Sequence, residues 1–549
     1  MGKLMMIGID GATLNLIVPW VKSGYLPNIG SFIKDGVYGE LDSTTPYLSP
    51  VAWTSLATGV RPAKHGVIDF VTRSPRSYDF RFTNAAMRKS AAVWNIFNKY
   101  GKRVSVINMP CSFPPDEVDG IMISGLDAPR NTEYITWPKG LLDEIKREIG
   151  HYTIDLSDEI DPRGKNNRID YDKVLAELHK MIDNRTEVVS YLMKKYSWDF
   201  MFPVFIALDR AQHFYWHFME NNYTGSDKLK RALFDLYSHI DDSVGKLIKL
   251  SPPDTTFFIV SDHGFGPLKG TIFLNNWFIE NGYLKPLGGI RYYKGKFFGS
   301  LPILITKYRR FFPKHLRELI KKRLKNKPLV LPPILEWIDW RNTKLFFEGQ
   351  TGSIYINLKG REPFGIVIPG DEYEKLAKEV ADKLTEMTDP LTKKRVVKKV
   401  YRGEEIYGAN LSEYTPDLLV IFNEGYEVGS NNSILTYSNG DVFGSHCWSG
   451  CHNQKGVFMA KGESIKKGVK INMASIIDVA PTLLYASNIP VPTYMDGKVL
   501  LSIFNDAYTA ANKPAYEDTP ISEKIRSSRE LTREEEEELK KRLEGLGYL

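Results

Sequence analysis

The chain has few cysteines and no long apolar run. Of its 549 residues only three are cysteines, Cys111, Cys447 and Cys451, too few for the disulfide framework of a small secreted domain. No uninterrupted apolar stretch approaches the roughly 20 residues that a membrane-spanning helix needs. Hydrophobic residues make up 42% of the sequence and charged residues 25%, as is typical of globular proteins. We therefore expect a cytoplasmic protein, and its length predicts two or three lobes.

Positive charge is concentrated in one segment. Between Arg291 and Lys327 the sequence has thirteen Lys or Arg residues and one acidic residue, Glu318, whereas the net charge of the whole chain is only +7. Residues 314–324 have the pattern of an amphipathic basic helix. Three interpretations remain open: a lid helix over the core, peripheral contact of 291–327 with an anionic membrane, and steering of a polyanionic substrate. No specific nucleic-acid partner is expected, and the sequence does not determine the oligomeric state.

Strand-like and helix-like patterns alternate from residue 1 to about 275. Tyr171 to Lys195 and Asp227 to Leu250, for example, carry Leu, Ile and Val at the three-and-four spacing of helices. The alternation predicts an α/β fold with a doubly wound, mostly parallel sheet flanked by helices. A later β-α-β-β order predicts an inserted α+β lobe. The expected parts are a first core part at 1–275, an inserted basic segment and cap lobe at 276–440, a second core part at 441–505 and a charged helical tail at 506–549.

The tail has the marks of a docked helix. Thr532 and Glu535 are spaced as a capping box at its start. Leu539, Leu543 and Leu546 form a narrow apolar stripe. This pattern predicts that the tail helix packs onto the body of the protein or onto another subunit.

Three aspartates follow apolar runs that look like buried strands. Asp10 and Asp209 directly follow such runs, and Asp262 follows a third run after one serine. In open α/β sheets, ligands bind beyond the carboxyl ends of parallel strands. A single aspartate at a strand end is often only the N-cap of the next helix. Three of them favour a shared binding site at one edge of the sheet.

Histidines accompany these aspartates. His213 comes four residues after Asp209, and His263 directly follows Asp262. Hard carboxylates mixed with imidazoles suit zinc or manganese and not calcium. The pattern therefore predicts a site for divalent metal ions.

The segment between the first two aspartates suggests a nucleophile. Residues 44–59 read Thr-Thr-Pro-Tyr-Leu-Ser-Pro-Val-Ala-Trp-Thr-Ser-Leu-Ala-Thr-Gly. Taken with the aspartate and histidine motifs in their order along the chain, this stretch resembles the alkaline phosphatase superfamily, particularly its type I phosphodiesterase/nucleotide pyrophosphatase branch. In that superfamily a nucleophile at the start of a helix precedes a Thr-Gly pair by ten residues. The residue ten before Gly59 is Ser49, and a helix N-terminus would stabilise its anion.

The resemblance also implies two metal sites. Seven residues are expected to form them: Asp10, Ser49, Asp262 and His263 for one ion, and Asp209, His213 and His452 for the other. The family places the last histidine shortly before the strand that returns to the sheet. His452 fits this spacing, and His446 is the alternative.

The function implied is that of a two-metal-dependent phosphohydrolase. It would cleave phosphodiester or pyrophosphate bonds of a small phosphate ester through a phosphoseryl intermediate, with two divalent ions, Zn or Mn, as cofactors. A phosphomonoesterase or phosphomutase would use the same residues. A membrane- or nucleic-acid-associated binding protein of the same fold is the non-enzymatic alternative, and it is disfavoured because every expected ligand is present. Ala52 stands where nucleotide pyrophosphatases carry an Asn, so the resemblance does not specify a nucleotide as substrate.

Overall fold

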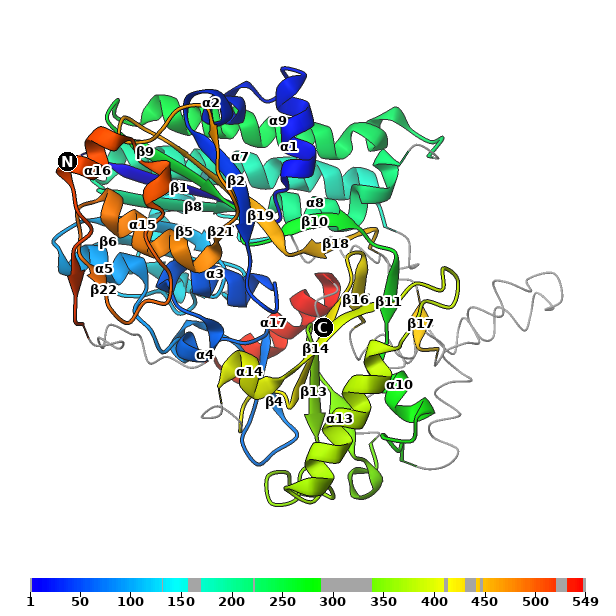
Figure 1. Cartoon of the computed structure of the whole chain (residues 1–549). Coiled ribbons are helices and arrows are strands. Elements are labelled where there is room, and N and C mark those ends of the chain that lie inside the picture. The colour runs from blue at the N-terminus through cyan, green and yellow to red at the C-terminus, as the bar shows by residue number, and fades with distance from the viewer. Residues whose placement is uncertain are drawn as a thin grey trace. The chain divides into compact units, whose positions relative to one another are not determined.

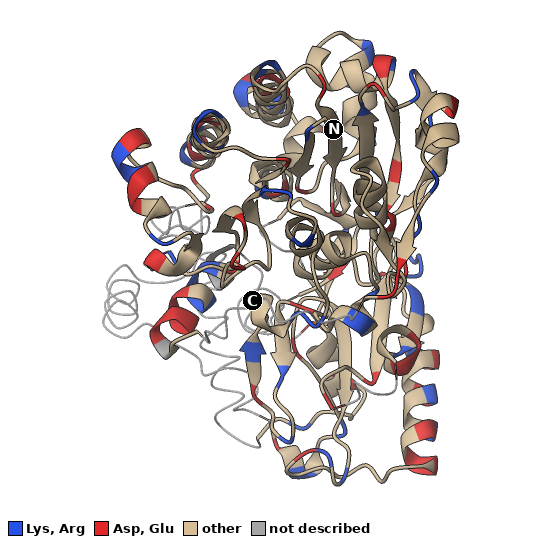
Figure 2. Cartoon of the chain, turned by 90° about the vertical axis from the view of Figure 1, so that its left-hand side faces the viewer, with Lys and Arg blue, Asp and Glu red and all other residues tan. Residues whose placement is uncertain are grey.

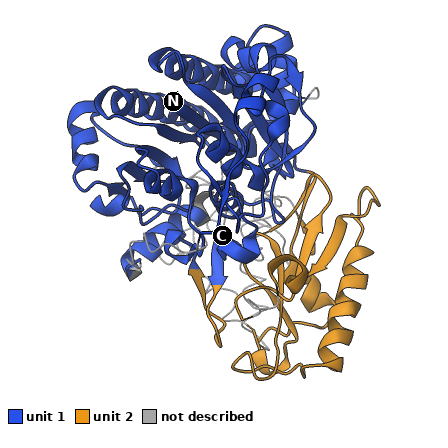
Figure 3. Cartoon of the chain, turned by 60° about the vertical axis from the view of Figure 1, so that its left-hand side comes forward, with its two compact units in different colours: residues 1–72, 82–268, 447–546 blue, residues 73–81, 269–446, 547–549 orange. Residues whose placement is uncertain are grey.

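The computed structural model describes residues 2–130, 132–156, 169–220, 223–287, 338–408, 413–429, 441–444, 448–519 and 531–546. The basic segment 291–327 and His446 lie outside these residues. The chain divides into two compact units, drawn in two colours in Figure 3. Unit 1 comprises Met1–Thr72, Phe82–Leu268 and Cys447–Leu546, and unit 2 comprises Arg73–Arg81, Lys269–His446 and Gly547–Leu549. The four parts expected from the sequence stay a prediction.

Unit 1 is built on a ten-stranded sheet. Its strands are β1 (Leu4–Ile9), β2 (Val37–Asp42), β5 (Val104–Met109), β6 (Gly120–Ser124), β7 (Thr136–Trp137), β8 (Phe200–Phe205), β9 (Thr256–Val260), β19 (Lys455–Lys461), β20 (Val469–Lys470) and β21 (Ala474–Ser475). The order is β20-β2-β19-β9-β1-β8-β5-β6-β7, with β21 beside β2. The five neighbours from β9 to β6 all run parallel, whereas β19 is antiparallel to β2 and β9. The predicted α/β fold with a mostly parallel sheet is thus confirmed.

The central strands explain why the apolar runs stand out in the sequence. All six residues of β1 and of β8 are buried, because helices cover both faces of a parallel sheet. Lys, Arg, Asp and Glu are absent from β1, β5, β8 and β9. Many of the charged residues lie on helices, as Figure 2 shows. β1 lies between β8 and β9 in register, with Gly8 opposite both Val204 and Val260. The carboxyl ends of the three strands therefore meet at one edge.

Helices flank both faces of this sheet. They are α1 (Leu14–Lys22), α2 (Pro27–Asp35), α3 (Ser49–Thr58), α4 (Pro62–His65), α5 (Val93–Lys99), α6 (Leu141–Ile149), α7 (Tyr171–Lys195), α8 (Ala207–Tyr215), α9 (Asp227–Leu250), α15 (Val479–Ala486), α16 (Asp506–Ala511) and α17 (Arg533–Leu546). In Figure 1, α7 and α9 cover one face, and α3, α5 and α15 cover the other. The bounds of α7 and α9 are those predicted from their apolar spacing.

One predicted boundary is wrong. The sequence places Asp209 at the end of a strand, but β8 stops at Phe205 and Asp209 lies in the first turn of α8. Every residue of α8 is buried, so its side chains show no polar face. The apolar run therefore extends past the end of β8 into the start of α8. No change in the spacing of its apolar residues marks where the strand ends.

Unit 2 contains a four-stranded antiparallel sheet in the order β12-β13-β15-β14 and a three-stranded sheet in the order β16-β11-β17. Its elements are α10 (Leu274–Glu280), α13 (Asp371–Thr385), α14 (Gly403–Tyr407), β11 (Gly270–Ile272), β12 (Leu345–Phe347), β13 (Gly352–Ile356), β14 (Val397–Arg402), β15 (Leu418–Phe422), β16 (Tyr426–Val428) and β17 (Phe443–Gly444). Leu376, Ala377 and Val380 of α13 share one hydrophobic core with Leu345, Ile354 and Leu418. The predicted β-α-β-β order is present in β13, α13, β14 and β15.

The tail helix α17 packs onto unit 1. Leu539 and Leu543 are 1% and 2% exposed, and Arg542 donates a hydrogen bond of 2.5 Å to the carbonyl of Leu126. The predicted capping box forms, with Thr532 and Glu535 each accepting the other's backbone N–H. Among the described residues, no helix is long and apolar enough to cross a bilayer.

Candidate metal centre

Segments far apart in the sequence meet at the carboxyl ends of β1, β8 and β9. Asp10 directly follows β1, and Asp262 and His263 follow β9. His452 lies on β18 (Gly450–Asn453), which pairs antiparallel with β10 (Gly264–Pro267) and so returns to the same place. Asp209 reaches it from the first turn of α8. All these residues belong to unit 1.

Asp10, Asp262 and His263 form the first group of possible ligands, with one ligand atom of each within 4.8 Å of the others. His263 Nε2 lies 3.6 Å from Asp10 Oδ1 and 3.3 Å from Asp262 Oδ2. Both of these carboxylate oxygens are buried and accept no hydrogen bond. Buried polar atoms are rarely left without a partner, so two such oxygens facing one imidazole fit a bound cation.

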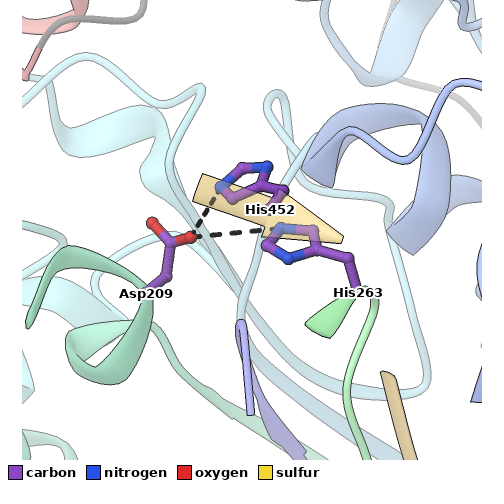
Figure 4. A group of neighbouring side chains, drawn as sticks. All are labelled: Asp209, His263 and His452. Carbon is purple, nitrogen blue, oxygen red and sulfur yellow. Dashed lines mark hydrogen bonds and ion pairs between the residues drawn. The ribbon is translucent and has the colours of Figure 1, made fainter. Parts of the chain in front are cut away.

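Asp209, His263 and His452 form the second group (Figure 4). His452 Nε2 lies 3.0 Å from Asp209 Oδ1, and His263 Nε2 lies 4.0 Å from the same oxygen. The rings of His263 and His452 stack with centroids 3.7 Å apart. His263 is therefore shared by the two groups, whereas the resemblance assigned it to one ion only.

His213, the remaining histidine among the predicted ligands, lies next to the second group. Its Nε2 is 3.0 Å from His452 Nε2 and 3.7 Å from Asp209 Oδ1. Its Nδ1 is 3.0 Å from the carbonyl of Gly450, to which it donates. That bond leaves the lone pair of Nε2 directed at the group, as in histidines that ligate metals.

Burial and mutual repulsion govern the carboxylates. Burial raises the pKa of Asp10 well above its ordinary value, and the charges of Asp262 and Asp209 raise it further. Burial and Asp209 raise the pKa of Asp262 to about 7. Burial also opposes the ionisation of Asp209, but His213, His452 and Arg210 outweigh it and lower the pKa of Asp209 well below its ordinary value.

The three histidines have the opposite shift. Burial lowers the pKa values of His213, His263 and His452. This shift favours the neutral form of each imidazole, and neutral imidazole is the form that ligates metals. Neutral imidazoles beside carboxylates that repel one another form a donor set that fits divalent cations.

Ser49 is the first residue of α3 and is 3% exposed. Its Oγ lies 3.3 Å from His263 Nε2, so the hydroxyl faces the first group. Nearby hydroxyls have other partners, because Ser43 donates to the carbonyl of Asp262 and Thr54 to that of Pro50. Of Ser43, Ser49 and Thr54, Ser49 is the one whose hydroxyl faces the first group.

Three supporting contacts were missed in the sequence. Trp53 donates its indole N–H to Asp10 Oδ2 over 3.0 Å. Arg210 donates to Asp209 Oδ2 and forms a paired contact with Asp155, at 2.9 and 3.1 Å. Trp53 and Arg210 lie inside the motifs that suggested the site, but Asp155 gives no signal in the sequence.

The turn after β1 requires glycine. Gly11 has a φ of 69°, and a Cβ there would lie 3.0 Å from the ring of Phe265 and 3.2 Å from the backbone of Asp209. Gln212 donates to the carbonyl of Gly11 over 2.8 Å, and Tyr237 donates to Gln212 over 3.0 Å. Positive φ and a close backbone approach both favour glycine. The turn thus holds Asp10 close to α8.

The sequence and the fold of the chain are similar to those of known proteins. The family model described as type I phosphodiesterase / nucleotide pyrophosphatase matches residues 4–449. No curated protein sequence matches the chain. Solved structures of ectonucleotide pyrophosphatase / phosphodiesterase 5 (ENPP5) from mouse and human are similar, with 11% and 13% identity. Each has a TM-score of 0.49 and covers 92% of this chain and 100% of its own. Another structure of the murine protein, an inactive form in complex with AMP, matches at 11% identity.

Proposed function

The chain belongs to the type I phosphodiesterase/nucleotide pyrophosphatase family, and we propose that it is a two-metal-dependent phosphohydrolase with Ser49 as nucleophile. The bonds it cleaves are phosphodiester or pyrophosphate bonds of a small phosphate ester. The observation that carries the proposal is the pair of buried oxygens, Asp10 Oδ1 and Asp262 Oδ2, that accept no hydrogen bond and lie beside His263. Ser49 Oγ faces the same imidazole nitrogen.

The residues divide into two ligand sets in this proposal. Asp10, Asp262 and His263, with Ser49, would hold one ion, and Asp209, His213 and His452 would hold the other. His263 lies close enough to Asp209 to contribute to either. Two bound zinc or manganese ions would supply Lewis acidity, which stabilises negative charge on phosphoryl oxygens.

Ser49 carries the covalent chemistry. Its Oγ gives its hydroxyl proton to solvent water and forms a bond to phosphorus. The bond to the leaving oxygen breaks on the opposite side, and the leaving group departs as an anion that takes up a proton from solvent where its pKa requires. The first turn of α3 stabilises the Ser49 anion, because the N–H groups of a helix N-terminus carry partial positive charge. Water then cleaves the phosphoseryl bond and restores the hydroxyl.

The test compares two substrates and three proteins. Bis-p-nitrophenyl phosphate and p-nitrophenyl phosphate are offered to wild type, Ser49→Ala and Thr54→Val after chelation and addition of zinc or manganese. Thr54 is the matched control, since it lies on the same helix and its hydroxyl bonds to the carbonyl of Pro50. We expect faster turnover of the diester, a loss of roughly a thousandfold or more in Ser49→Ala, and near-wild-type turnover in Thr54→Val.

Other outcomes lead to other conclusions. Turnover retained in Ser49→Ala would contradict the nucleophile. Preference for the monoester would replace the proposal by the phosphomonoesterase or phosphomutase alternative. If zinc and manganese fail to bind at all, the enzymatic proposal is wrong.

We also propose that the basic segment 291–327 makes peripheral contact with anionic membranes. Its support is the sequence alone: the excess of Lys and Arg and the amphipathic pattern of 314–324. Flotation with phosphatidylserine vesicles should carry the intact chain but not a variant that lacks 291–327. If the intact chain stays at the bottom of the gradient, this proposal is wrong.

A further inference from the structure

A concave site lies in unit 1, apart from the residues of the metal centre. It is an open cavity of about 470 Å³ between α1, the 3-10 turn Trp216–Met219 and α9. Five aromatic side chains line it, and we name it the aromatic cavity: Trp20, Tyr25, Phe218, Tyr223 and Phe234. Its volume falls in the range of small-molecule sites.

The rings form two groups from different parts of the chain. Phe234 makes edge-to-face contacts with Trp20 and Tyr25, at centroid distances of 5.5 and 4.9 Å. Phe218 makes a similar contact with Tyr223, at 4.8 Å. Tyr25 remains 55% exposed. Aromatic surface left open to solvent within a concave site is typical of a place where a ligand binds.

Two cations line the same cavity. Lys230 and Arg231 lie near the start of α9, with side chains 41% and 64% exposed. The guanidinium of Arg231 lies 5.0 Å from the centre of the Phe234 ring and 3.2 Å from Asp235. Among the described residues, Lys230 forms one ion pair, a long contact of 3.7 Å with Asp227. The cavity thus joins a flat aromatic wall to an exposed positive edge, and Glu220 is the one acidic residue of its lining.

We propose that the aromatic cavity binds a planar aromatic molecule that carries an anionic group, as a nucleoside monophosphate does. The ring of the ligand would pack against Trp20, Tyr25 and Phe234, since stacked and edge-to-face aromatic contacts are favourable. Its anionic group would bind Lys230 and Arg231. The carboxylate of Glu220 would accept an N–H from the ring.

The cavity is linked to the metal centre by a row of three side chains, Trp20, Tyr237 and Gln212. The ring of Trp20 lies 5.1 Å from that of Tyr237. The hydroxyl of Tyr237 donates to Gln212, which in turn donates to the carbonyl of Gly11 beside Asp10. A ligand that packs against Trp20 would therefore contact the side chain that packs on Tyr237. Tyr237 and Gln212 in turn hold the turn after β1.

The test measures binding and does not depend on catalysis. The full-length protein is treated with EDTA and titrated by calorimetry with AMP, adenosine and ribose 5-phosphate. Adenosine lacks the anionic group of the proposed ligand, and ribose 5-phosphate lacks its aromatic ring. We expect AMP to bind with one-to-one stoichiometry and at least tenfold more tightly than either. The aromatic sulfonate 8-anilinonaphthalene-1-sulfonate should compete with AMP, because it offers the same combination of ring and anion.

Substitutions in the aromatic cavity test whether AMP binds there. Tyr25→Ala and the double variant Lys230→Glu/Arg231→Glu should each weaken AMP binding at least tenfold. Both alter exposed side chains, so the fold should be retained. The matched control is Lys246→Glu/Lys249→Glu, which reverses two exposed charges further along α9 and should change the affinity less than twofold. The proposal is overturned if neither AMP nor the sulfonate binds, or if these cavity variants bind AMP as wild type does. It is equally overturned if the cavity instead joins two copies of the chain, seen as a dimer that Tyr25→Ala dissociates.

Discussion

Trp53 illustrates how a single donor supports the metal centre. Its indole N–H bonds to Asp10 Oδ2, while Oδ1 of the same carboxylate accepts no hydrogen bond. One oxygen is thus held by the protein and the other is left for a cation. Hydrogen bonds of this kind orient the side chains that bind a metal and commonly contribute to metal affinity.

Replacing Trp53 should therefore weaken metal binding. Trp53→Phe keeps the aromatic packing but removes the N–H, and we expect zinc affinity to fall roughly tenfold to a hundredfold in calorimetric titrations. Trp94→Phe is the matched control, because Trp94 donates to the buried Asp116 over 2.7 Å in the same way. It should lower stability and leave zinc affinity unchanged. Equal zinc affinity in Trp53→Phe and wild type would contradict the role of Trp53.

His65 makes stability depend on pH. It is fully buried; its Nδ1 accepts the N–H of Val67 and its Nε2 donates to Ser55. Burial, with the nearby charge of Arg88, lowers its pKa from 6.5 to about 3. Below pH 6.5 the His65 imidazole is therefore protonated in the unfolded chain, whereas in the folded chain it stays neutral down to about pH 3. Hence His65 lowers the free energy of unfolding as the pH falls, by about 2 kcal/mol at pH 5.

Chemical denaturation at pH 7.5 and pH 5 tests this expectation. In His65→Asn, the loss of stability between the two pH values should be about 2 kcal/mol smaller than in wild type. The cavity left by the smaller side chain costs the same at both pH values, so it cancels in the difference. His151→Asn, at an exposed histidine, should behave as wild type does. An unchanged pH dependence in His65→Asn would refute the argument.

At the scale of elements, α17 is held by its apolar stripe. Leu539 and Leu543 are almost fully buried, and Glu538 accepts the backbone N–H of Arg130 over 2.9 Å. Leu543→Ala removes buried methyl groups and leaves a cavity. We expect it to lower the free energy of unfolding by about 2–4 kcal/mol in urea titrations. Leu391→Ala, at a leucine that is 90% exposed, should change it by less than about 0.5 kcal/mol.

The same elements show which parts of the structure can be inferred from the sequence. α7 and α9 each have one buried and one exposed face, so the spacing of their apolar residues gave both bounds. α8 is buried all round, and the boundary before Asp209 could not be found in this way. Asp10 and Asp262 lie together as expected. They follow neighbouring buried strands, β1 and β9, whose parallel register aligns their carboxyl ends.

Long-range contacts are the part that the sequence could not supply. Arg210 meets Asp155 across 55 residues, and Trp53 meets Asp10 across 43. No periodicity or motif spacing encodes such pairs, because they depend on how loops and helices pack after the sheet has formed. The sharing of His263 between the two ligand groups is of the same kind. It follows from the stacking of His263 on His452, which comes from a distant strand.

At the scale of the whole molecule, the metal centre is costly to fold without cations. Asp10, Asp209 and Asp262 are buried together, and Arg210 is the cation that pairs directly with one of them among the described residues. Like charges in a buried site repel one another, and burial of each charge adds a further cost. Ligands that bind only the folded state stabilise it by mass action. The folded protein should therefore depend on bound metal for part of its stability.

The effect of Asp262→Asn on stability should change sign when metal is added. In EDTA, the substitution removes one of the repelling carboxylates, so its melting temperature should equal or exceed that of wild type. With zinc or manganese at about a hundred times the dissociation constant, wild type should gain about 2.7 kcal/mol, and the variant should gain much less. Asp116→Asn, which breaks the buried ion pair with Arg88, should be destabilised in both conditions. Thermal melts of the three proteins, with and without metal, test this prediction. If Asp262→Asn is destabilised in EDTA as Asp116→Asn is, Asp262 makes an ordinary structural contact and is not a metal ligand.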